Sequence, residues 1–228
     1  MVDVALFELE NVLFDTRELR RSAVTEACAA HGIVAAAEPD QLERASAHAA
    51  IQAILTANGI GHDDVLIDLI ARRAERAFSA RLAQRGAVLA PGAAPFVADA
   101  ASAARLAVVT RASRGDAELL LRLSGLDGAF SVVITSSEVL DAKPSPEGHR
   151  AALERMARQR PVRHGAAIAL EDGSAGIRAA RAAGARCVAA GDVPAHVAME
   201  ADAYLASLAE TSLGALDKLS TPGPEHVR

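Results

Sequence analysis

Apolar residues are spaced in two different ways along the chain, and the change comes near residue 90. A predominantly apolar run over residues 2–9 opens the sequence and is typical of a strand buried on both faces of a sheet. From residue 16 to 85 the apolar residues recur at helical spacing, and no strand-like run interrupts them. We expect three helices there, ended by His31-Gly32, Asn58-Gly59 and Arg85-Gly86, the second over residues 39–57 and the third over 63–84.

Beyond Pro91-Gly92 the pattern alternates between helices and strands. Alternation of this kind predicts a parallel sheet with helices on both of its faces. The expected strands lie at residues 106–110, 132–135, 166–170 and 186–190. The expected helices lie at residues 93–104, 116–123, 146–158 and 175–183. The fold class is therefore α/β, with a Rossmann-like parallel-sheet core.

The helical block interrupts the α/β pattern directly after its first strand, which predicts two domains. Residues 1–15 together with 88–220 form the α/β core, and residues 16–87 form a separate helical domain inserted after the first strand. The last residues, 221–228, are rich in proline and are expected to be a disordered tail.

Charge and cysteine usage narrow the class of protein without naming its activity. The formal net charge is −5 and the pI is about 5.8, so no basic surface argues for nucleic acid. No apolar run reaches the roughly 18 residues that a membrane helix needs, and the N-terminus lacks the basic start of a signal peptide. Cys28 and Cys187 are far apart and isolated, which is typical of a reduced, cytoplasmic protein. We therefore expect neither a nucleic-acid nor a membrane partner.

Chemically useful residues come at the carboxyl ends of the expected strands. In open α/β sheets, ligands bind outside those ends, so the side chains there are the first candidates for a site. Residues two apart in a strand point the same way, so Glu8 and Glu10 could face one pocket. The other candidates at strand ends are Thr110, Arg111, Ser113, Lys143, Glu171 and Asp172.

This set of residues suits phosphoryl transfer. A carboxylate can attack a phosphoryl group and hold it covalently. Mg²⁺ takes oxygen ligands, and a hydroxyl, a lysine and backbone N–H groups can neutralise the remaining phosphate charge. Plainer roles are also open. Thr110 could cap the turn after its strand, Glu171-Asp172 could cap the next helix, and Lys143 could be a surface lysine.

Four segments, in order, resemble the motifs of the haloacid dehalogenase superfamily. Residues 7–16, FELENVLFDT, resemble the first motif, Asp-x-Asp-Gly-x-x-x-Asp-Thr/Ser. Val108-Val109-Thr110 resembles the second, Lys143-Pro144 the third and residues 169–184 the fourth. The fourth is similar to the pattern of the phosphatase and β-phosphoglucomutase-like branch. In that branch a helical cap domain follows the first motif, as the helical block does here.

The resemblance implies a role for each matching residue. Glu8 would be the nucleophile and a metal ligand, and Glu10 would be the general acid and base, with its backbone carbonyl on the metal. Asp172, helped by Glu171, would complete a Mg²⁺ site. The substrate would be a small phosphorylated molecule. The residues that would bind its phosphoryl group are Thr110 and Lys143.

The first motif departs from the family pattern at three positions. Both motif aspartates are glutamates, Glu8 and Glu10, and the motif glycine is Asn11. Glutamate is one methylene longer than aspartate and displaces its oxygens by roughly an ångström, and misplacement on that scale can cost about 10²-fold in rate. Asparagine tolerates a positive φ better than most residues, so the loop can keep its shape with Asn11.

Two functions of different classes follow from these residues. The first is a Mg²⁺-dependent phosphohydrolase for a small phosphorylated metabolite, with low activity and a weaker Mg²⁺ site than usual. The second is a degenerate family member that binds a phosphorylated ligand or a protein partner without turnover. A sugar-phosphate mutase is less favoured, because Arg20 stands where β-phosphoglucomutases commonly carry a histidine. Dehalogenation is also less favoured, because the candidate set suits phosphate and metal.

Overall fold

The structure, a computed structural model, describes residues 1–34, 47–86, 88–209 and 211–220. Two compact units make up the chain: Met1–Asp15 with Val88–Arg228, and Thr16–Ala87. The expected tail over 221–228 and the first part of the expected helix over 39–57 lie outside the described residues. Among the described residues, no helix combines the length and apolar character that crossing a membrane would need.

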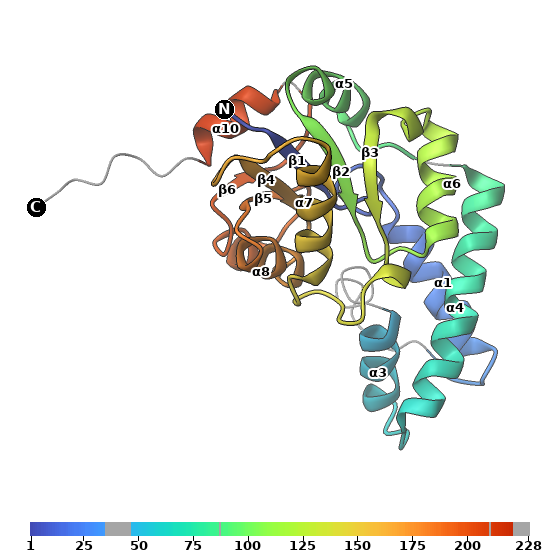
Figure 1. Cartoon of the computed structure of the whole chain (residues 1–228). Coiled ribbons are helices and arrows are strands. Elements are labelled where there is room, and N and C mark those ends of the chain that lie inside the picture. The colour runs from blue at the N-terminus through green and yellow to red at the C-terminus, as the bar shows by residue number, and fades with distance from the viewer. Residues whose placement is uncertain (35–46, 87, 210, 221–228) are drawn as a thin grey trace, which may run out of the picture. The chain divides into compact units, whose positions relative to one another are not determined.

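A six-stranded parallel sheet forms the centre of the first unit (Figure 1). The strands are β1 (Val4–Phe7), β2 (Arg105–Val109), β3 (Phe130–Ile134), β4 (Ala167–Glu171), β5 (Arg186–Ala190) and β6 (Ala203–Leu205). Their order across the sheet is β3-β2-β1-β4-β5-β6, and every neighbouring pair is parallel. This topology confirms the predicted α/β fold with a Rossmann-like parallel sheet.

The strand register brings the carboxyl ends of the three central strands to one edge of the sheet. Phe7 of β1 pairs with Val108 of β2 and with Leu170 of β4. The ladder continues one step past β1, because the Glu8 N–H donates to the Leu170 carbonyl at 3.0 Å. Glu8 and Thr110, the residues that follow β1 and β2, therefore emerge at the same edge.

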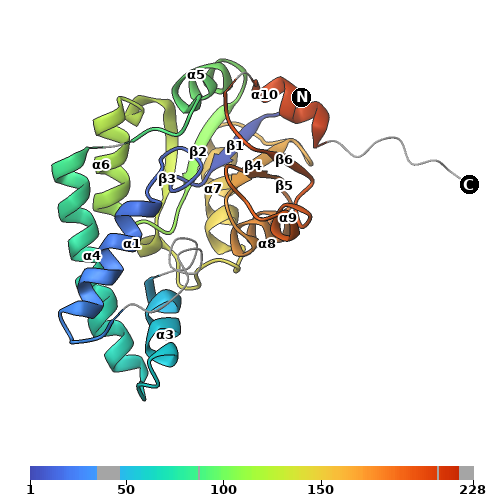
Figure 2. The same ribbon diagram turned by 180° about the vertical axis from the view of Figure 1, so that it is seen from behind.

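Helices cover both faces of this sheet (Figures 1 and 2). They are α5 (Ala93–Ala103), α6 (Arg114–Ser124), α7 (Glu147–Gln159), α8 (Ser174–Ala182), α9 (Ala195–Ala198) and α10 (Leu213–Leu219). One face carries alternate strand residues such as Leu6, Val109 and Ala169, which form a buried core with Ala152 of α7. Phe7 points to the opposite face, where its ring contacts Phe96 of α5 edge-on at 6.1 Å between centroids.

The last strand and two short helices of this unit were not predicted from the sequence. β6 has three residues, α9 four and α10 seven, and segments this short hold too few residues to show a clear period. Elements that were predicted are present, and their described ends shift by no more than about two residues. One shift matters for the site: the strand predicted at 106–110 ends at Val109, so Thr110 lies just beyond β2.

The described parts of the second unit, residues 16–34 and 47–86, contain helices and no strand. The helices are α1 (Arg17–Ala29), α3 (Ala47–Ala57) and α4 (Asp64–Arg85). Their apolar faces form a separate core that includes Cys28, Ile51 and Ile70. Arg20 of α1 also belongs to the packing of this unit, because its guanidinium pairs with Glu75 of α4 at 2.7 Å and lies 3.7 Å from the centre of the Phe78 ring.

Candidate active site

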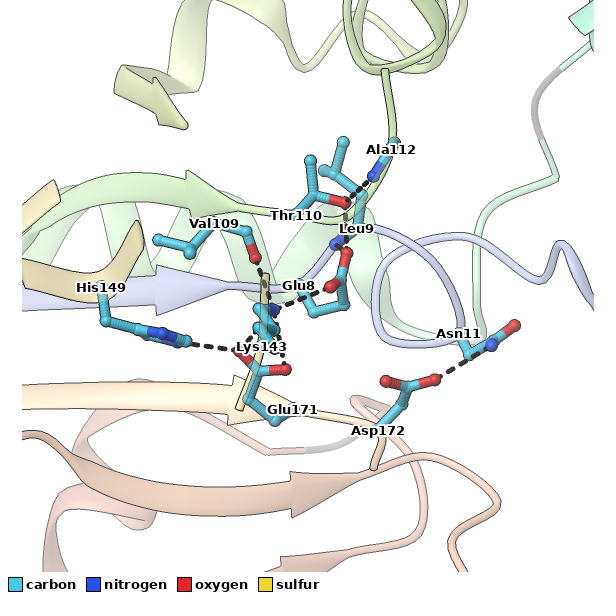
Figure 3. Close-up of polar contacts among 10 residues, drawn as sticks. All are labelled: Glu8, Leu9, Asn11, Val109, Thr110, Ala112, Lys143, His149, Glu171 and Asp172. Carbon is cyan, nitrogen blue, oxygen red and sulfur yellow. Dashed lines mark hydrogen bonds and ion pairs between the residues drawn. The ribbon is translucent and has the colours of Figure 1, made fainter. Parts of the chain in front are cut away.

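A carboxylate, a hydroxyl and an ammonium group meet where β1 and β2 end (Figure 3). The Glu8 side chain is buried, with 2% exposed. One of its oxygens, Oε1, accepts hydrogen bonds from the Leu9 N–H at 2.8 Å and from the Thr110 hydroxyl. The other, Oε2, accepts one from Lys143 Nζ at 2.8 Å. Three donors of different kinds thus converge on one carboxylate.

Thr110 both donates and accepts at this point. Its hydroxyl donates to Glu8 and accepts from the Ala112 N–H at 3.2 Å. The second bond fixes the turn after β2, so the turn-capping role considered for Thr110 is real. That bond also orients the hydroxyl hydrogen toward the carboxylate. The same oxygen therefore caps the turn and takes part in the hydrogen bonds around Glu8.

Lys143 lies at the centre of the site and is not a surface lysine. It comes from the segment before α7, and its side chain is 7% exposed. Its Nζ donates to Glu8, to the Val109 carbonyl at 2.9 Å and to both oxygens of Glu171, at 2.8 and 3.0 Å. Desolvation opposes the ammonium charge, but the attraction of Glu171 and Glu8 outweighs it and raises the pKa of Lys143.

Glu171 has a partner that was not predicted from the sequence. His149 on α7 is fully buried, and its Nε2 lies 2.9 Å from Glu171 Oε1. Burial disfavours the Glu171 carboxylate, but Lys143 and the bond from His149 outweigh that effect and lower the pKa of Glu171. The sequence holds one signal for such a role. His149 lies three and seven residues before Ala152 and Met156, so it belongs to the buried, otherwise apolar face of α7.

Asn11 and Asp172 meet beside this cluster. Asn11 has φ 61°, the left-handed conformation expected for the motif glycine, and its Nδ2 donates to Asp172 Oδ2 at 3.0 Å. Desolvation, with a contribution from the charge of Glu8, raises the pKa of Asp172 to about 6, against the opposing effect of Arg111. The helix-capping role considered for Glu171-Asp172 is wrong, because the cap position of α8 is Gly173 and no side chain caps it.

Glu10 lies in the loop that turns back after β1. The loop is closed by bonds from the Asn11 N–H to the Phe14 carbonyl at 2.6 Å and from the Leu13 N–H to the Leu9 carbonyl at 3.0 Å. Glu10 itself is half-buried. Its charge acts on Arg111: desolvation opposes the guanidinium charge, but Asp172, Glu8 and Glu10 together raise the pKa of Arg111.

The oxygen atoms here fit a Mg²⁺ ion only in part. No group of three or more His, Cys, Asp or Glu side chains with metal-binding geometry occurs in the described ranges. Proteins often hold Mg²⁺ with one or two carboxylates, water and phosphate oxygens, and Asp172 suits such a site because its raised pKa marks an incompletely balanced negative charge. Glu8 and Glu171 suit it less, because each of their oxygens already accepts a hydrogen bond from the chain.

Comparison with known proteins decides the family. A sequence profile described as haloacid dehalogenase-like hydrolase matches residues 5–190. The chain belongs to this hydrolase family. It is 33% identical to protein CbbY of Cereibacter sphaeroides over 245 aligned positions, covering 98% of this chain and 99% of that protein. It is 38% identical to validoxylamine A 7'-phosphate phosphatase of Streptomyces hygroscopicus subsp. limoneus over 106 positions, which are 46% of this chain and 48% of that one.

A solved structure agrees with these relatives. A variant of CbbY from Rhodobacter sphaeroides, crystallised with xylulose-(1,5)-bisphosphate, is 33% identical, with a TM-score of 0.78. The match covers 95% of this chain and 100% of that one. Family membership confirms the resemblance drawn from the four motifs and the prediction of a hydrolase.

The individual roles of the candidate residues stay predictions, although the structure shows where each residue lies. Direct hydrogen bonds join Glu8, Thr110, Lys143 and Glu171. Asp172 is joined instead to the loop after β1, and Glu10 lies within that loop.

Proposed function

We propose that this protein hydrolyses the phosphomonoester of a small phosphorylated sugar. The donors around Glu8 carry this proposal. The Leu9 N–H, the Thr110 hydroxyl and the Lys143 ammonium are the kinds of group that neutralise a phosphoryl group, and all three converge on one anionic group. The relative named as a phosphatase supports the reaction, and the CbbY variant crystallised with a sugar bisphosphate supports the substrate class.

In the proposed reaction a Glu8 oxygen attacks the phosphorus atom while the bond from phosphorus to the ester oxygen breaks. Glu10 donates a proton to that oxygen, so the alcohol leaves and a phosphoryl group remains on Glu8. Glu10, now a carboxylate, takes a proton from the water that attacks the phosphorus. Phosphate leaves, and both glutamates return to their starting states. Thr110 and Lys143 neutralise the oxygens of the transferred group throughout.

A Mg²⁺ ion would be held by Asp172 and the backbone carbonyl of Glu10, with Glu8 and Glu171 as further candidate ligands. When bound, it would neutralise negative charge on the phosphoryl oxygens. Asp172 would hold such an ion at the same edge of the sheet as Lys143. The Asn11 amide competes for one oxygen of Asp172, which is a reason to expect weaker Mg²⁺ binding than usual.

The test is phosphate release from a panel of sugar phosphates, with and without Mg²⁺. We expect slow turnover by the wild type, because the Glu8 oxygens lie among the donors that a phosphoryl group needs. Glu8→Gln should abolish turnover, and Glu8→Asp should raise kcat, with Glu10→Asp adding to the gain. Glu118→Gln, an exposed position on α6, is the matched control and should change nothing.

Two results would count against this proposal in different ways. Absence of phosphate release by both the wild type and Glu8→Asp would remove the hydrolase activity. Fast wild-type turnover that falls in Glu8→Asp would instead show that the site is built for the longer side chain, and that Glu8 is a fully competent nucleophile.

A non-catalytic binding protein is the second candidate, and the bonds to Glu8 and Asp172 favour it. Every oxygen of Glu8 is engaged, and the Asn11 amide takes one oxygen of Asp172. This alternative predicts that sugar phosphates bind, as calorimetry would show, while neither the wild type nor Glu8→Asp releases phosphate.

We also propose that the helical unit over residues 16–87 acts as a cap that selects the substrate. Its separate core supports this, because a unit with its own core can move as a body. Hydrogen exchange with and without a bound sugar phosphate would test it through protection gained at exposed sites of this unit. A cytoplasmic location stays a prediction, supported by Cys28 and Cys187, which are both free thiols.

A further inference from the structure

We propose that His149 is a positioning residue: it orients the Glu171 carboxylate toward Lys143 and thereby fixes the Lys143 ammonium beside Glu8. The inference rests on the proposed function for its kinetic consequences and on the contacts of His149 for the rest. His149 does not touch Glu8 or Thr110 in the hydrogen-bond network, so it would act through Glu171 alone.

The contact itself assigns the hydrogen. Both oxygens of Glu171 accept hydrogen bonds from the Lys143 ammonium, at 2.8 and 3.0 Å, as an ionised carboxylate does. Such a carboxylate can only accept, so the hydrogen in the 2.9 Å contact lies on His149 Nε2. The other ring nitrogen, Nδ1, is buried and has no hydrogen-bond partner among the described residues. A buried polar atom without a partner is costly, and an apolar side chain would avoid that cost. Packing alone therefore does not account for an imidazole at this position.

Helix α8 closes the other side of the same carboxylate. A Cβ atom built on Gly176 would lie 1.9 Å from Glu171 Oε2 and 2.6 Å from Glu171 Cδ, so only glycine leaves room for the carboxylate. Glu171 is thus held between the imidazole of His149 and the backbone of α8. In this orientation both of its oxygens reach Lys143 Nζ, at 2.8 and 3.0 Å.

The position of Lys143 depends on this arrangement. Its ammonium group has three hydrogens and is shared among Glu8, the Val109 carbonyl and the two oxygens of Glu171. If Glu171 turned away, Lys143 would keep its bonds to Glu8 and Val109 but lose the partner that fixes its third direction. An ammonium that is misdirected toward the phosphoryl group slows the chemical step more than it weakens substrate binding.

Two substitutions separate positioning from packing. His149→Phe fills the space without a donor, and His149→Gln supplies an amide N–H near the place of Nε2. We expect His149→Phe to lower kcat by about 10- to 100-fold with a smaller change in KM, and His149→Gln to restore most of the loss. Thermal unfolding shows that each variant is folded. His164→Phe is the control and should leave kcat unchanged. His164 is exposed and precedes the amino end of β4, whereas Glu171 lies at the carboxyl end of that strand.

A spectroscopic readout does not depend on turnover. The chain has two lysines, Lys143 and Lys218, so ¹⁵N-lysine labelling gives one signal from the buried ammonium and one from an exposed ammonium on α10. In His149→Phe the Lys143 ¹⁵Nζ signal should shift or exchange faster with water, and in His149→Gln it should return toward its wild-type position. The Lys218 signal should stay constant in all variants.

The kinetic readout and the Lys143 signal distinguish a failure of the proposed function from a failure of the inference about His149. If the wild type releases no phosphate from any substrate, the proposed function fails, and the Lys143 signal alone decides the role of His149. If that signal is the same in the wild type and in folded His149→Phe, His149 does not position Lys143 and the inference is wrong. Equal loss of kcat in the Phe and Gln variants, with an unchanged signal, would also overturn it.

Discussion

Charged side chains lie at both ends of β1 and β4, and the two ends differ in how their carboxylates are paired with cations. At the amino end, Asp3 pairs with one arginine, Arg163, whose Nε and terminal nitrogen contact the carboxylate at 2.6 to 3.1 Å and whose backbone N–H adds a further bond at 2.9 Å. The Arg163 side chain is 63% exposed. At the carboxyl end, Glu8 and Glu171 are buried and share the single ammonium of Lys143.

The amino end is a balanced pair, and the carboxyl end carries an excess of buried negative charge. Burying an ion costs several kcal/mol, and a partner offsets that cost only when charges and hydrogen bonds match. Two buried carboxylates share one lysine, and nearby Asp172 adds a third carboxylate, whose pKa stays raised although Arg111 acts to lower it. An arrangement that folding alone would disfavour is typical of a site that awaits a ligand. The same two strands thus carry a balanced ion pair at one end and the proposed active site at the other.

The largest effect should come from removing Lys143. Lys143→Met keeps an unbranched side chain that is one atom shorter, but leaves Glu8 and Glu171 as buried carboxylates without their shared cation. We expect a loss of about 3–5 kcal/mol in the free energy of unfolding near neutral pH. Urea denaturation measures it. Lys218→Met, at the exposed lysine of α10, is the control and should lie within about 0.5 kcal/mol of the wild type.

Acid should reduce the loss of stability in Lys143→Met, because protonation of the buried Glu171 carboxylate removes an unpaired charge. The difference from the wild type should therefore shrink between pH 7 and pH 4. A stability loss in Lys143→Met that stays as large at pH 4 as at pH 7 would mean that lost packing, and not unpaired charge, is the cause.

A smaller effect of opposite sign is expected at Asp172. The pKa of Asp172 is raised to about 6, above the ordinary value of about 3.9, so ionising it costs the folded state and stability falls as the pH rises from about 4 to 6. Asp172→Asn removes that loss and should stabilise the protein by on the order of 1–2 kcal/mol at pH 7, with no gain at pH 4. Thermal and urea unfolding at both pH values check this. A destabilised Asp172→Asn at pH 7 would show that Asp172 is already balanced by its neighbours.

The sequence predicted much of the carboxyl end, because strand periodicity and motif order are local signals. Alternating elements specified the parallel sheet, and residues after the strands specified which carboxylates would meet at its carboxyl edge. His149 could not be predicted in the same way. Its position in the apolar stripe of α7 looks like core packing, and only the fold shows that this stripe faces Glu171. The bond from Asn11 to Asp172 spans 161 positions and has no local signature either.

Short elements and side-chain partners were the other features that could not be predicted from the sequence. β6 has three residues and is held by pairing with β5, which the sequence does not display. The sequence showed only where Arg20 falls in the family pattern. Its pairing with Glu75 depends on how α1 packs against α4. Backbone conformation was easier, since Asn11 was expected to tolerate a positive φ and has φ 61°.

Asn11→Gly should have a more modest effect, which is on Mg²⁺ binding at the carboxyl end of the strands. Glycine adopts the same positive φ at no cost, so the substitution removes the amide and keeps the loop. Asp172 Oδ2 then loses its donor and becomes available to a cation. One hydrogen bond is worth roughly 0.5–1.5 kcal/mol, so the Kd for Mg²⁺ should fall about two- to tenfold. Calorimetric titration measures it, and Asp172→Asn, which should lose binding, is the reference. Unchanged Mg²⁺ affinity in Asn11→Gly would place the ion elsewhere.

The smallest effect is expected at the balanced amino end. Hydrogen bonds from the Arg163 guanidinium hold the pKa of Asp3 well below its ordinary range. A lowered carboxyl pKa contributes stability that is present above the ordinary value of about 3.9 and is lost as the pH falls through the folded value. Asp3→Asn should therefore destabilise the protein slightly and evenly from pH 5 to 8, and the difference should vanish in acid. Salt should weaken the effect, because Arg163 is largely exposed. Urea denaturation at low and high salt checks both points. If Asp3→Asn stabilised the protein at neutral pH, as Asp172→Asn is expected to do, the two ends would not differ in the way their contacts indicate.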